Sequence, residues 1–290
     1  MNGVLEFLAG PWEYDFWRRA LLVAVMSGAV CGVIGSHVVL RGMAFIGDAV
    51  AHSVFPGVAV AFVFGFDLVV GGAVAGLLTA LLVAVFSQNR RLKEDSVIGI
   101  FFAAAFGLGI VVLSTAPGYS GSLESFLFGS ILGISDDDVR NVAVIGALLL
   151  ALAALLHTKL VAASLDREQA RALGMPVFWL DIALYAMVTL AIVISLQAVG
   201  NVLVLALLIT PAGAARLLTD RLGVMMLLAP AMGAGSCVVG LYLSYAWDLA
   251  AGGLVVLTVT AAFLLCWFLA PRHGLLAKLR ARPAPAVDSR

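Results

Sequence analysis

Residues 68–87 read LVVGGAVAGLLTALLVAVFS, a run of 20 residues without a charged side chain. A helix of about 20 apolar residues is long enough to cross a hydrocarbon core of about 30 Å. Because no water is available in that core, a helix has to satisfy every backbone polar group within its own segment. This stretch therefore predicts a membrane-spanning helix.

Apolar stretches of this kind recur along most of the 290 residues. Hydrophobic residues make up 63% of the chain and charged residues 12%, whereas a globular chain is about half apolar and about a quarter charged. The sequence therefore predicts an all-α, polytopic membrane helix bundle that forms one domain over residues 1–290, without a soluble second domain.

The expected number of membrane spans is nine. Windows of helical length place them at 17–40, 43–65, 67–87, 96–115, 139–157, 178–199, 201–219, 224–245 and 251–270. Eight spans with a broken or re-entrant helix is the alternative. This alternative is kept because two of the nine spans are unusual. The second is the least apolar, since it contains Asp48 and His52, and the seventh contains Pro211.

The distribution of Lys and Arg predicts which loops lie in the cytoplasm, because cytoplasmic loops are enriched in these residues. Three segments carry them and are expected inside: 88–95, 158–177 and 216–223. The basic tail at 271–290 falls on the same side. The N-terminus is then outside, with residues 1–16 as an interfacial segment.

Arg18 and Arg19 argue against this orientation, because they lie at the outer end of the first span. We interpret them as side chains that extend to the lipid head groups. Trp12, Tyr14 and Trp17 are interpreted as an aromatic anchor at the same interface.

Catalytic motifs are absent from the sequence, which contains no HExxH, GxSxG or Walker A pattern. The chain is therefore expected to be no enzyme, and any ATP that drives transport must be hydrolysed by another subunit. The formal net charge is zero, so the overall charge gives no reason to expect nucleic acid as a partner.

The segment GDAVAHSVFPG at 47–57 carries the main candidate site. Asp48 and His52 are one helical turn apart, so they share a face with about 6 Å between them. Ionisable groups inside a span usually face a bundle interior or a watery path, which makes the pair a functional-site hypothesis. A hydrogen bond that only fixes helix packing is the alternative.

An imidazole and a carboxylate together suit Zn²⁺ or Mn²⁺. Two ligands from one helix form an incomplete shell, and a symmetric homodimer would bring a second Asp48 and His52 to complete four. Pro56 and Gly57 are expected to loosen the helix backbone beside the site.

The cytoplasmic segment contains LDREQARALGMPV at 165–177, which predicts a short polar helix. Asp166 can cap its N-terminus, Gly174 can end it, and Pro176 blocks its continuation. Two interpretations remain: an interfacial helix that only completes a turn, or a docking surface for a cytosolic partner.

The remaining polar residues of the spans carry weaker hypotheses. His37 and His157 end their spans, where an isolated histidine is usually an interfacial residue. Gln197, beside Asn201, is interpreted as helix–helix contact. Glu124 and the acidic run 136–138 lie outside, where they attract cations, dock a partner or are simply solvated.

Several segments together resemble the membrane permeases of the zinc/manganese/iron class of bacterial ABC importers. The longest is VVLRGMAFIGDAVAHSVFPGVAVAF at 38–62, which contains the specific GDAxxHxxxPG element. The others are RRALL at 18–22, DSVIGIFF at 95–102, FLFGSILGIS at 126–135, LDREQARALG at 165–174 and LQAVGNVLVLALLITPAGAARLL at 196–218.

The resemblance implies a type II importer architecture in the bacterial plasma membrane. It implies a homodimeric permease with cytosolic ABC ATPase subunits and an extracytoplasmic metal-binding protein as partners. The cargo is zinc, manganese or iron, which passes transiently, and no cofactor stays bound. Asp48 and His52 match the residues that line the family's translocation path. The positions that match its ATPase-coupling segment are Asp166, Glu168, Ala170 and Gly174.

Two positions depart from the family's pattern. Ser130 stands where an acidic residue is common, which weakens the case for a metal-attracting site outside. His37 stands where an aliphatic or aromatic residue is usual, and it is retained with Pro56 and Gln197 as an accessory candidate.

Two other function classes compete with the importer. The first is an ATP-independent secondary carrier or channel for divalent metals, in which Asp48 and His52 exchange protons for metal. The coupling-like segment argues against it, because a carrier has no use for that segment. The second is an intramembrane metalloenzyme, which needs more ligands in one chain than the sequence offers.

Overall fold

The computed structural model describes residues 10–43, 45–88, 94–114 and 133–270. Every regular element in these ranges is a helix: η1 (Gly10–Glu13), α2 (Asp15–Arg41), α3 (Phe45–Phe64), α4 (Leu68–Phe86), α5 (Glu94–Ser114), α7 (Asp136–Leu165), α8 (Arg167–Ala172), α9 (Val177–Val199), α10 (Asn201–Leu218), α11 (Leu222–Trp247) and α12 (Ala251–Leu269). The all-α prediction is confirmed.

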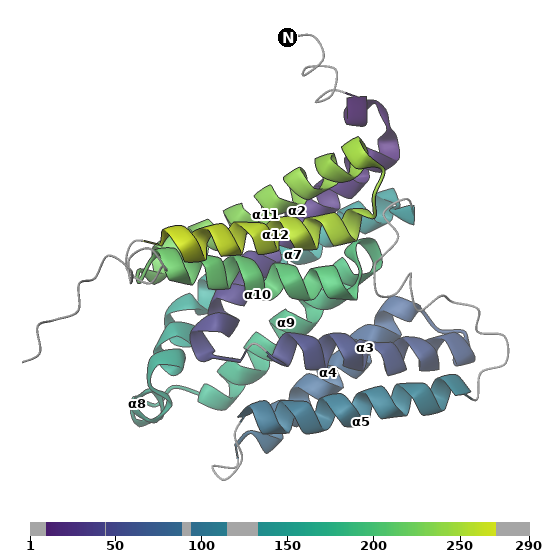
Figure 1. The fold of residues 1–290 in the computed structure, drawn as a ribbon. Coiled ribbons are helices and arrows are strands. Elements are labelled where there is room, and N and C mark those ends of the chain that lie inside the picture. Colours follow the sequence, from purple (N-terminus) through teal and green to yellow (C-terminus); the bar gives the residue numbers. More distant parts are fainter. Residues whose placement is uncertain (1–9, 44, 89–93, 115–132, 271–290) are drawn as a thin grey trace, which may run out of the picture.

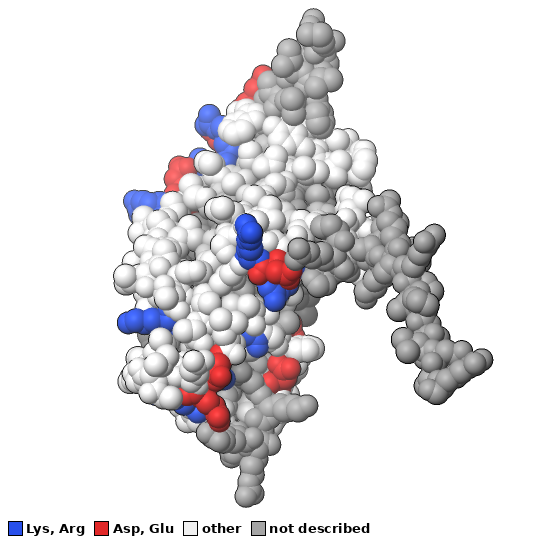
Figure 2. Space-filling model, turned by 90° about the vertical axis from the view of Figure 1, so that its left-hand side faces the viewer, with Lys and Arg blue, Asp and Glu red and all other residues white. Residues whose placement is uncertain are grey.

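Eight of the described helices are long and apolar enough to cross a membrane. The seventh predicted span, 201–219, is α10, whose 18 residues give a length of about 27 Å. It lies within the bundle against α2, α11 and α12. Figure 2 looks onto one end of the bundle, where basic and acidic side chains are scattered over the described face.

The fifth predicted span, 139–157, is too short, because α7 continues to Leu165. His157, Thr158 and Lys159 suggested a helix end in the sequence. No Gly or Pro interrupts the chain after them, and Leu160 and Ala163 are buried. The helix ends only at Asp166, whose φ of −148° is extended. The predicted cytoplasmic segment 158–177 is thus largely helical.

The helices form two groups (Figure 1). In the first, α3 packs against both α4 and α5, which follow it in sequence. In the second, α2 packs against α11, α10, α7 and α9. Helix α9 also contacts α4 and α3 and therefore connects the two groups. The candidate site on α3 lies within the first group, on the side that faces α5.

Glycines allow α2 to approach its neighbours closely. A Cβ atom at Gly35 would lie 1.7 Å from the carbonyl oxygen of Leu208 on α10. One at Gly28 would lie 2.9 Å from the backbone of Gly233 on α11. Small residues at helix contacts let backbones pack in membranes, where the hydrophobic effect gives little drive for association.

The helix α2 ends in a tight turn that leads into α3. Gly42 has a φ of +72°, which favours glycine. Its N–H donates to the Val39 carbonyl, and the N–H of Met43 donates to the Val38 carbonyl. These two bonds form a Schellman motif, which fixes the direction in which the chain leaves α2.

The outer residues of α2 make contacts that the sequence did not predict. Arg18 pairs with Asp15, and Arg19 Nε lies 2.7 Å from Asp136 Oδ1 of α7. Carboxylates of the protein therefore balance these arginines, whereas we expected lipid head groups to do so. Trp17 is buried against Tyr245, with 5.6 Å between ring centroids, so it packs inside the bundle.

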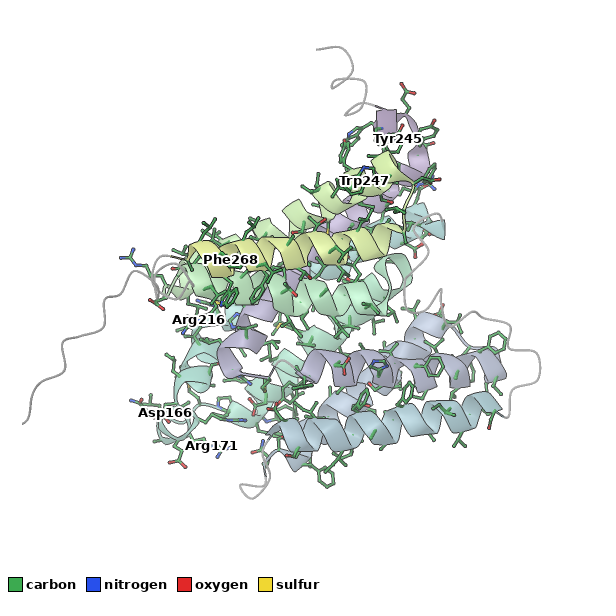
Figure 3. The ribbon with its side chains drawn as sticks, viewed as in Figure 1. Asp166, Arg171, Arg216, Tyr245, Trp247 and Phe268 are labelled. Carbon is green, nitrogen blue, oxygen red and sulfur yellow. The ribbon has the colours of Figure 1, made fainter. Side chains whose placement is uncertain are left out.

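The residues expected in the cytoplasm lie toward one end of the bundle. Figure 3 places Arg216, Asp166 and Arg171 toward that end and Tyr245 and Trp247 toward the other. This arrangement is the one that the predicted orientation requires. The loop residues Arg90, Arg91 and Lys93 and the tail 271–290 lie outside the described residues.

The orientation predicts the accessibility of introduced thiols. In a chain whose three cysteines are replaced by serine, cysteines at the exposed Gln88 and Gln169 should escape an impermeant thiol reagent in intact cells. Both should react once the cells are permeabilised. A cysteine at Asp137, expected outside, should react without permeabilisation. Reaction of the first two from outside would reverse the orientation.

Candidate functional site

Asp48 and His52 lie on one face of α3, as predicted. His52 Nε2 is 3.5 Å from Asp48 Oδ1. The Asp48 side chain is 40% exposed and the His52 side chain 24% exposed. A carboxylate and an imidazole with converging, accessible donor atoms can bind the same cation.

Two aromatic rings of α5 hold the imidazole of His52. The ring centroids of Phe102 and Phe106 lie 5.1 and 5.5 Å from that of His52, both edge to face. The two phenyl rings are themselves nearly parallel, with 10° between their planes. This packing restricts the rotation of the imidazole and directs it toward the space between α3 and α5.

A cavity of about 290 Å³ opens beside Asp48, between the first turns of α3 and α5. Its lining includes Asp48 and a second carboxylate, Asp95 of α5. Sequence reasoning missed Asp95, because an acidic residue in the first turn of a helix is ordinarily explained by the helix dipole. Asp95 lies at the end of α5 that the predicted orientation puts toward the cytoplasm.

One chain supplies an incomplete metal site. Among the described residues, no three His, Cys, Asp or Glu side chains are grouped closely enough to hold a metal ion. Asp48 and His52 therefore contribute two ligands, and further ligands must come from water, a backbone oxygen or another chain. An open, weak shell suits a cation that has to leave the site again.

Pro56 and Gly57 shape α3 beside the pair. Pro56 has no N–H, so the His52 carbonyl loses the donor that it would have in a regular helix. At Gly57, a Cβ atom would lie 2.2 Å from the Gly71 carbonyl oxygen of α4. Gly57 therefore permits α3 and α4 to cross closely. The sequence predicted only that Gly57 loosens the backbone of α3.

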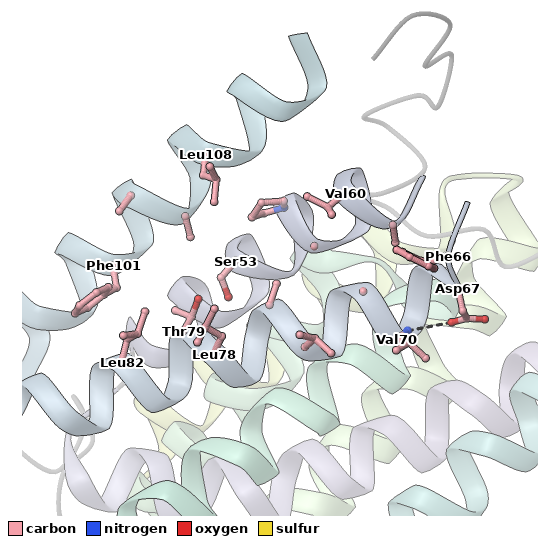
Figure 4. A pocket seen from close by; sticks show the side chains of 18 residues that line it. Ser53, Val60, Phe66, Asp67, Val70, Leu78, Thr79, Leu82, Phe101 and Leu108 are labelled. Carbon is pink, nitrogen blue, oxygen red and sulfur yellow. Dashed lines mark hydrogen bonds between the residues drawn. The ribbon is translucent and has the colours of Figure 1, made fainter. Parts of the chain in front are cut away.

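A larger cavity of about 700 Å³ lies between α3, α4 and α5 (Figure 4). Apolar side chains such as Val60, Leu78 and Leu108 line most of it. Its one carboxylate, Asp67, accepts a hydrogen bond of 3.0 Å from the N–H of Val70 and caps α4. This cavity supplies no set of metal ligands, so the smaller one is the better candidate.

The accessory candidates lie elsewhere or cannot be placed. His37 is fully buried and contacts His157 of α7, with ring centroids 5.5 Å apart. Since no group of three ligands forms among the described residues, His37 does not join Asp48 and His52. The side chain of Gln197 lies outside the described part of the chain, as do Glu124 and Ser130.

The predicted polar helix of the cytoplasmic segment is α8. The Asp166 carboxylate accepts hydrogen bonds of 2.9 Å from the N–H groups of Glu168 and Gln169, and Ala170 is buried. Gly174 has a φ of +73° and ends the helix. The predicted cap and stop residues are confirmed.

Two large apolar side chains flank α8 and are exposed. Leu165 is 75% exposed and Leu173 is 68% exposed. Sequence reasoning overlooked both, because leucines in a helical segment are ordinarily assigned to the core. Together with Glu168 and Arg171 they form a mixed apolar and charged surface around α8, which is typical of an interaction site.

Comparison with known proteins gives consistent matches over nearly the whole chain. The ABC 3 transport family matches residues 13–270. The chain is 41% identical over 278 residues to "Manganese transport system membrane protein MntC" of Halalkalibacterium halodurans, covering 96% of this chain and 95% of that protein. It is 38% identical over 274 residues to "Chelated iron transport system membrane protein YfeC" of Yersinia pestis, covering 94% and 93%.

Solved structures share the fold. In "PsaBC from Streptococcus pneumoniae in complex with Fab", one chain is 37% identical and superposes with a TM-score of 0.83, covering 95% of this chain and 99% of that one. A metal-chelate type ABC transporter in an inward-facing conformation, 19% identical, has a TM-score of 0.70 and covers 86% of this chain and 85% of its own.

Proposed function

Because this chain belongs to the ABC 3 transport family and is a multi-pass permease of the bacterial plasma membrane, we propose that Asp48 and His52 form its metal path. The observation that carries the proposal is their position: a carboxylate and an imidazole with 3.5 Å between them, beside a cavity between α3 and α5. Both side chains are accessible inside a span, where such groups are rare unless they serve a path.

The cargo that we propose is a divalent first-row transition metal, with manganese first. Relatives similar to this chain over more than nine-tenths of its length are named for manganese and for iron. Oxygen and nitrogen donors accept manganese, iron and zinc alike. Zinc therefore stays in the test as a competing cargo.

Two copies of the chain are proposed to form the path together. The support is the incomplete ligand set, because a two-fold axis near Asp48 and His52 would double two ligands to four. The exposed side chains of α5, which include Ile100, Leu108 and Val111, leave an apolar helix surface beside the site that a second copy can cover.

A separate cytosolic ATPase is proposed to dock on α8, and an extracytoplasmic protein to deliver the metal. The support for the first is the exposed Leu165 and Leu173 around a helix that extends from the membrane bundle. The proposed docking positions lie on α8 and at its two ends: Asp166, Glu168, Ala170 and Gly174. The sequence lacks a nucleotide-binding motif, so the work has to arrive through such a contact.

The proposed function is tested by uptake of labelled manganese in cells that carry the complete operon, with and without this chain. We expect manganese uptake to fall to background without the chain. Excess unlabelled iron or zinc should lower manganese uptake only if that metal is also a cargo. A variant ATPase without its Walker A lysine should also stop uptake. Continued uptake with that variant would favour the ATP-independent carrier.

A further inference from the structure

A buried group of charged side chains joins α8 to the bundle. Asp181 of α9 has a side chain that is 2% exposed, and one of its oxygens lies 2.6 Å from Arg41 Nη1 of α2. Its other oxygen pairs with Arg167, the first residue of α8. Arg41 Nε also donates a hydrogen bond of 3.0 Å to Ser164 Oγ of α7.

This group, Arg41–Asp181–Arg167, is poorly explained by stability alone. Desolvation offsets much of the attraction in a buried ion pair, and apolar residues of similar size often stabilise a fold as well. Removing one partner, however, leaves an uncompensated charge in a buried place. Arg41 is only 6% exposed and its Nη2 has no hydrogen-bond partner among the described residues, so its charge depends on Asp181.

The same group lies next to the turn that leads to the metal path. Arg41 is the last residue of α2, and the Gly42–Met43 turn follows it directly. Met43 is buried, and its Sδ accepts a contact of 3.5 Å from the hydroxyl of Tyr185. Tyr185 lies one helical turn after Asp181 on α9. Two successive turns of α9 therefore contact the end of α2 and the turn after it, through Arg41 and Met43.

The chain then continues into α3, whose first turn contains Asp48. Contacts therefore lead from Arg167 to Asp181 and Arg41, and the chain leads from Arg41 to the start of α3. Separating Arg167 from Asp181 is unfavourable because both charges are partly or fully withdrawn from water. Two ion pairs and a hydrogen bond thus connect the four helices α2, α7, α8 and α9 at this point.

We propose that Arg41, Asp181 and Arg167 are positioning residues that transmit movement of α8 to Asp48, and thereby couple ATP hydrolysis to opening of the metal path. The proposal rests on the proposed function, in which α8 receives the ATPase. None of the three residues is proposed to touch the metal. Substituting them should therefore lower the metal taken up per ATP hydrolysed, without removing a metal ligand.

The test uses the complete transporter in proteoliposomes, with its ATPase and binding protein, and measures metal taken up per ATP hydrolysed. In Arg167→Gln we expect the ATPase to co-purify and to hydrolyse ATP, while uptake per ATP falls by about 5-fold or more. Arg167→Lys, which keeps the charge, should recover part of the ratio. Asp181→Asn should lower the ratio too, and the double variant should be no worse than the worse single variant.

Arg140→Gln serves as the control, because Arg140 forms an exposed ion pair with Asp137 at 3.0 Å on the opposite side of the bundle. It should leave the ratio unchanged. Arg167 is half-buried, so its variants should insert and assemble even if Asp181→Asn does not.

Two results would overturn the inference. One is an unchanged ratio in an assembled Arg167→Gln transporter, and the other is loss of ATPase co-purification, which would make Arg167 a docking residue only. If the unaltered transporter itself shows no ATP-dependent uptake, the proposed function fails, and this outcome is separate from both.

Discussion

Metal uptake should fall to background when Asp48 is replaced by Asn or His52 by Gln, at unchanged membrane abundance. Each substitution keeps the size and the hydrogen-bonding capacity of the side chain but removes a strong metal ligand. Because no three His, Cys, Asp or Glu side chains of the described residues group closely enough to hold a metal ion, either substitution leaves the pair with one strong ligand. Loss of a metal contact of this kind lowers affinity by about 10-fold to 100-fold or more.

Uptake of labelled manganese, corrected for abundance by immunoblot, measures the effect. Asp67→Asn is a matched control, since Asp67 caps α4 away from the pair and Asn is an equally good cap residue. It should transport normally. Near-normal uptake by both Asp48→Asn and His52→Gln would instead assign the pair to helix packing.

Substitutions at the two ends of α8 should lower the metal taken up per ATP hydrolysed while ATP hydrolysis continues. Gly174→Val places a branched side chain at a φ of +73°, which is unfavourable by about 1–2 kcal/mol. A Cβ atom there meets no neighbour within 4 Å, so the effect comes from the backbone and not from a clash. Replacing both Asp166 and Glu168 by Ala removes the N-terminal cap, worth about 1 kcal/mol.

In both variants the ATPase should still hydrolyse ATP, while metal uptake per ATP falls, because a frayed α8 no longer presents a fixed surface. Gly174→Asn is the control, since Asn tolerates the left-handed conformation, and it should retain most of the coupling. If both disturbed variants keep normal ATPase binding and normal uptake, α8 has no docking role.

The helices and their order could be predicted because each span needs a long apolar stretch, and such a stretch is local in sequence. The pair on α3 could be predicted for the same reason, since Asp48 and His52 are neighbours on one helix. The capped helix α8 was equally accessible, because Asp166 and Gly174 act on the backbone within a few residues of themselves.

The contacts between distant segments could not be predicted. Asp181 meets Arg41 across 140 residues of sequence, and Arg19 meets Asp136 although α3, α4 and α5 lie between them in the sequence. Each residue alone resembled an ordinary charge near a helix end. Asp95 lines the same cavity as Asp48 only because α3 and α5 start at the same level.

The close packing of α2 on α11 has a consequence for how the chain is made. Gly28 and Gly35 of α2 are synthesised within the first 41 residues, whereas the helices that they contact, α10 and α11, begin only at Asn201 and Leu222. During most of insertion these glycines therefore have no partner helix, while α3, α4 and α5 can already assemble with one another. A chain that stalls before Asn201 therefore lacks both helices that Gly28 and Gly35 contact in the complete bundle.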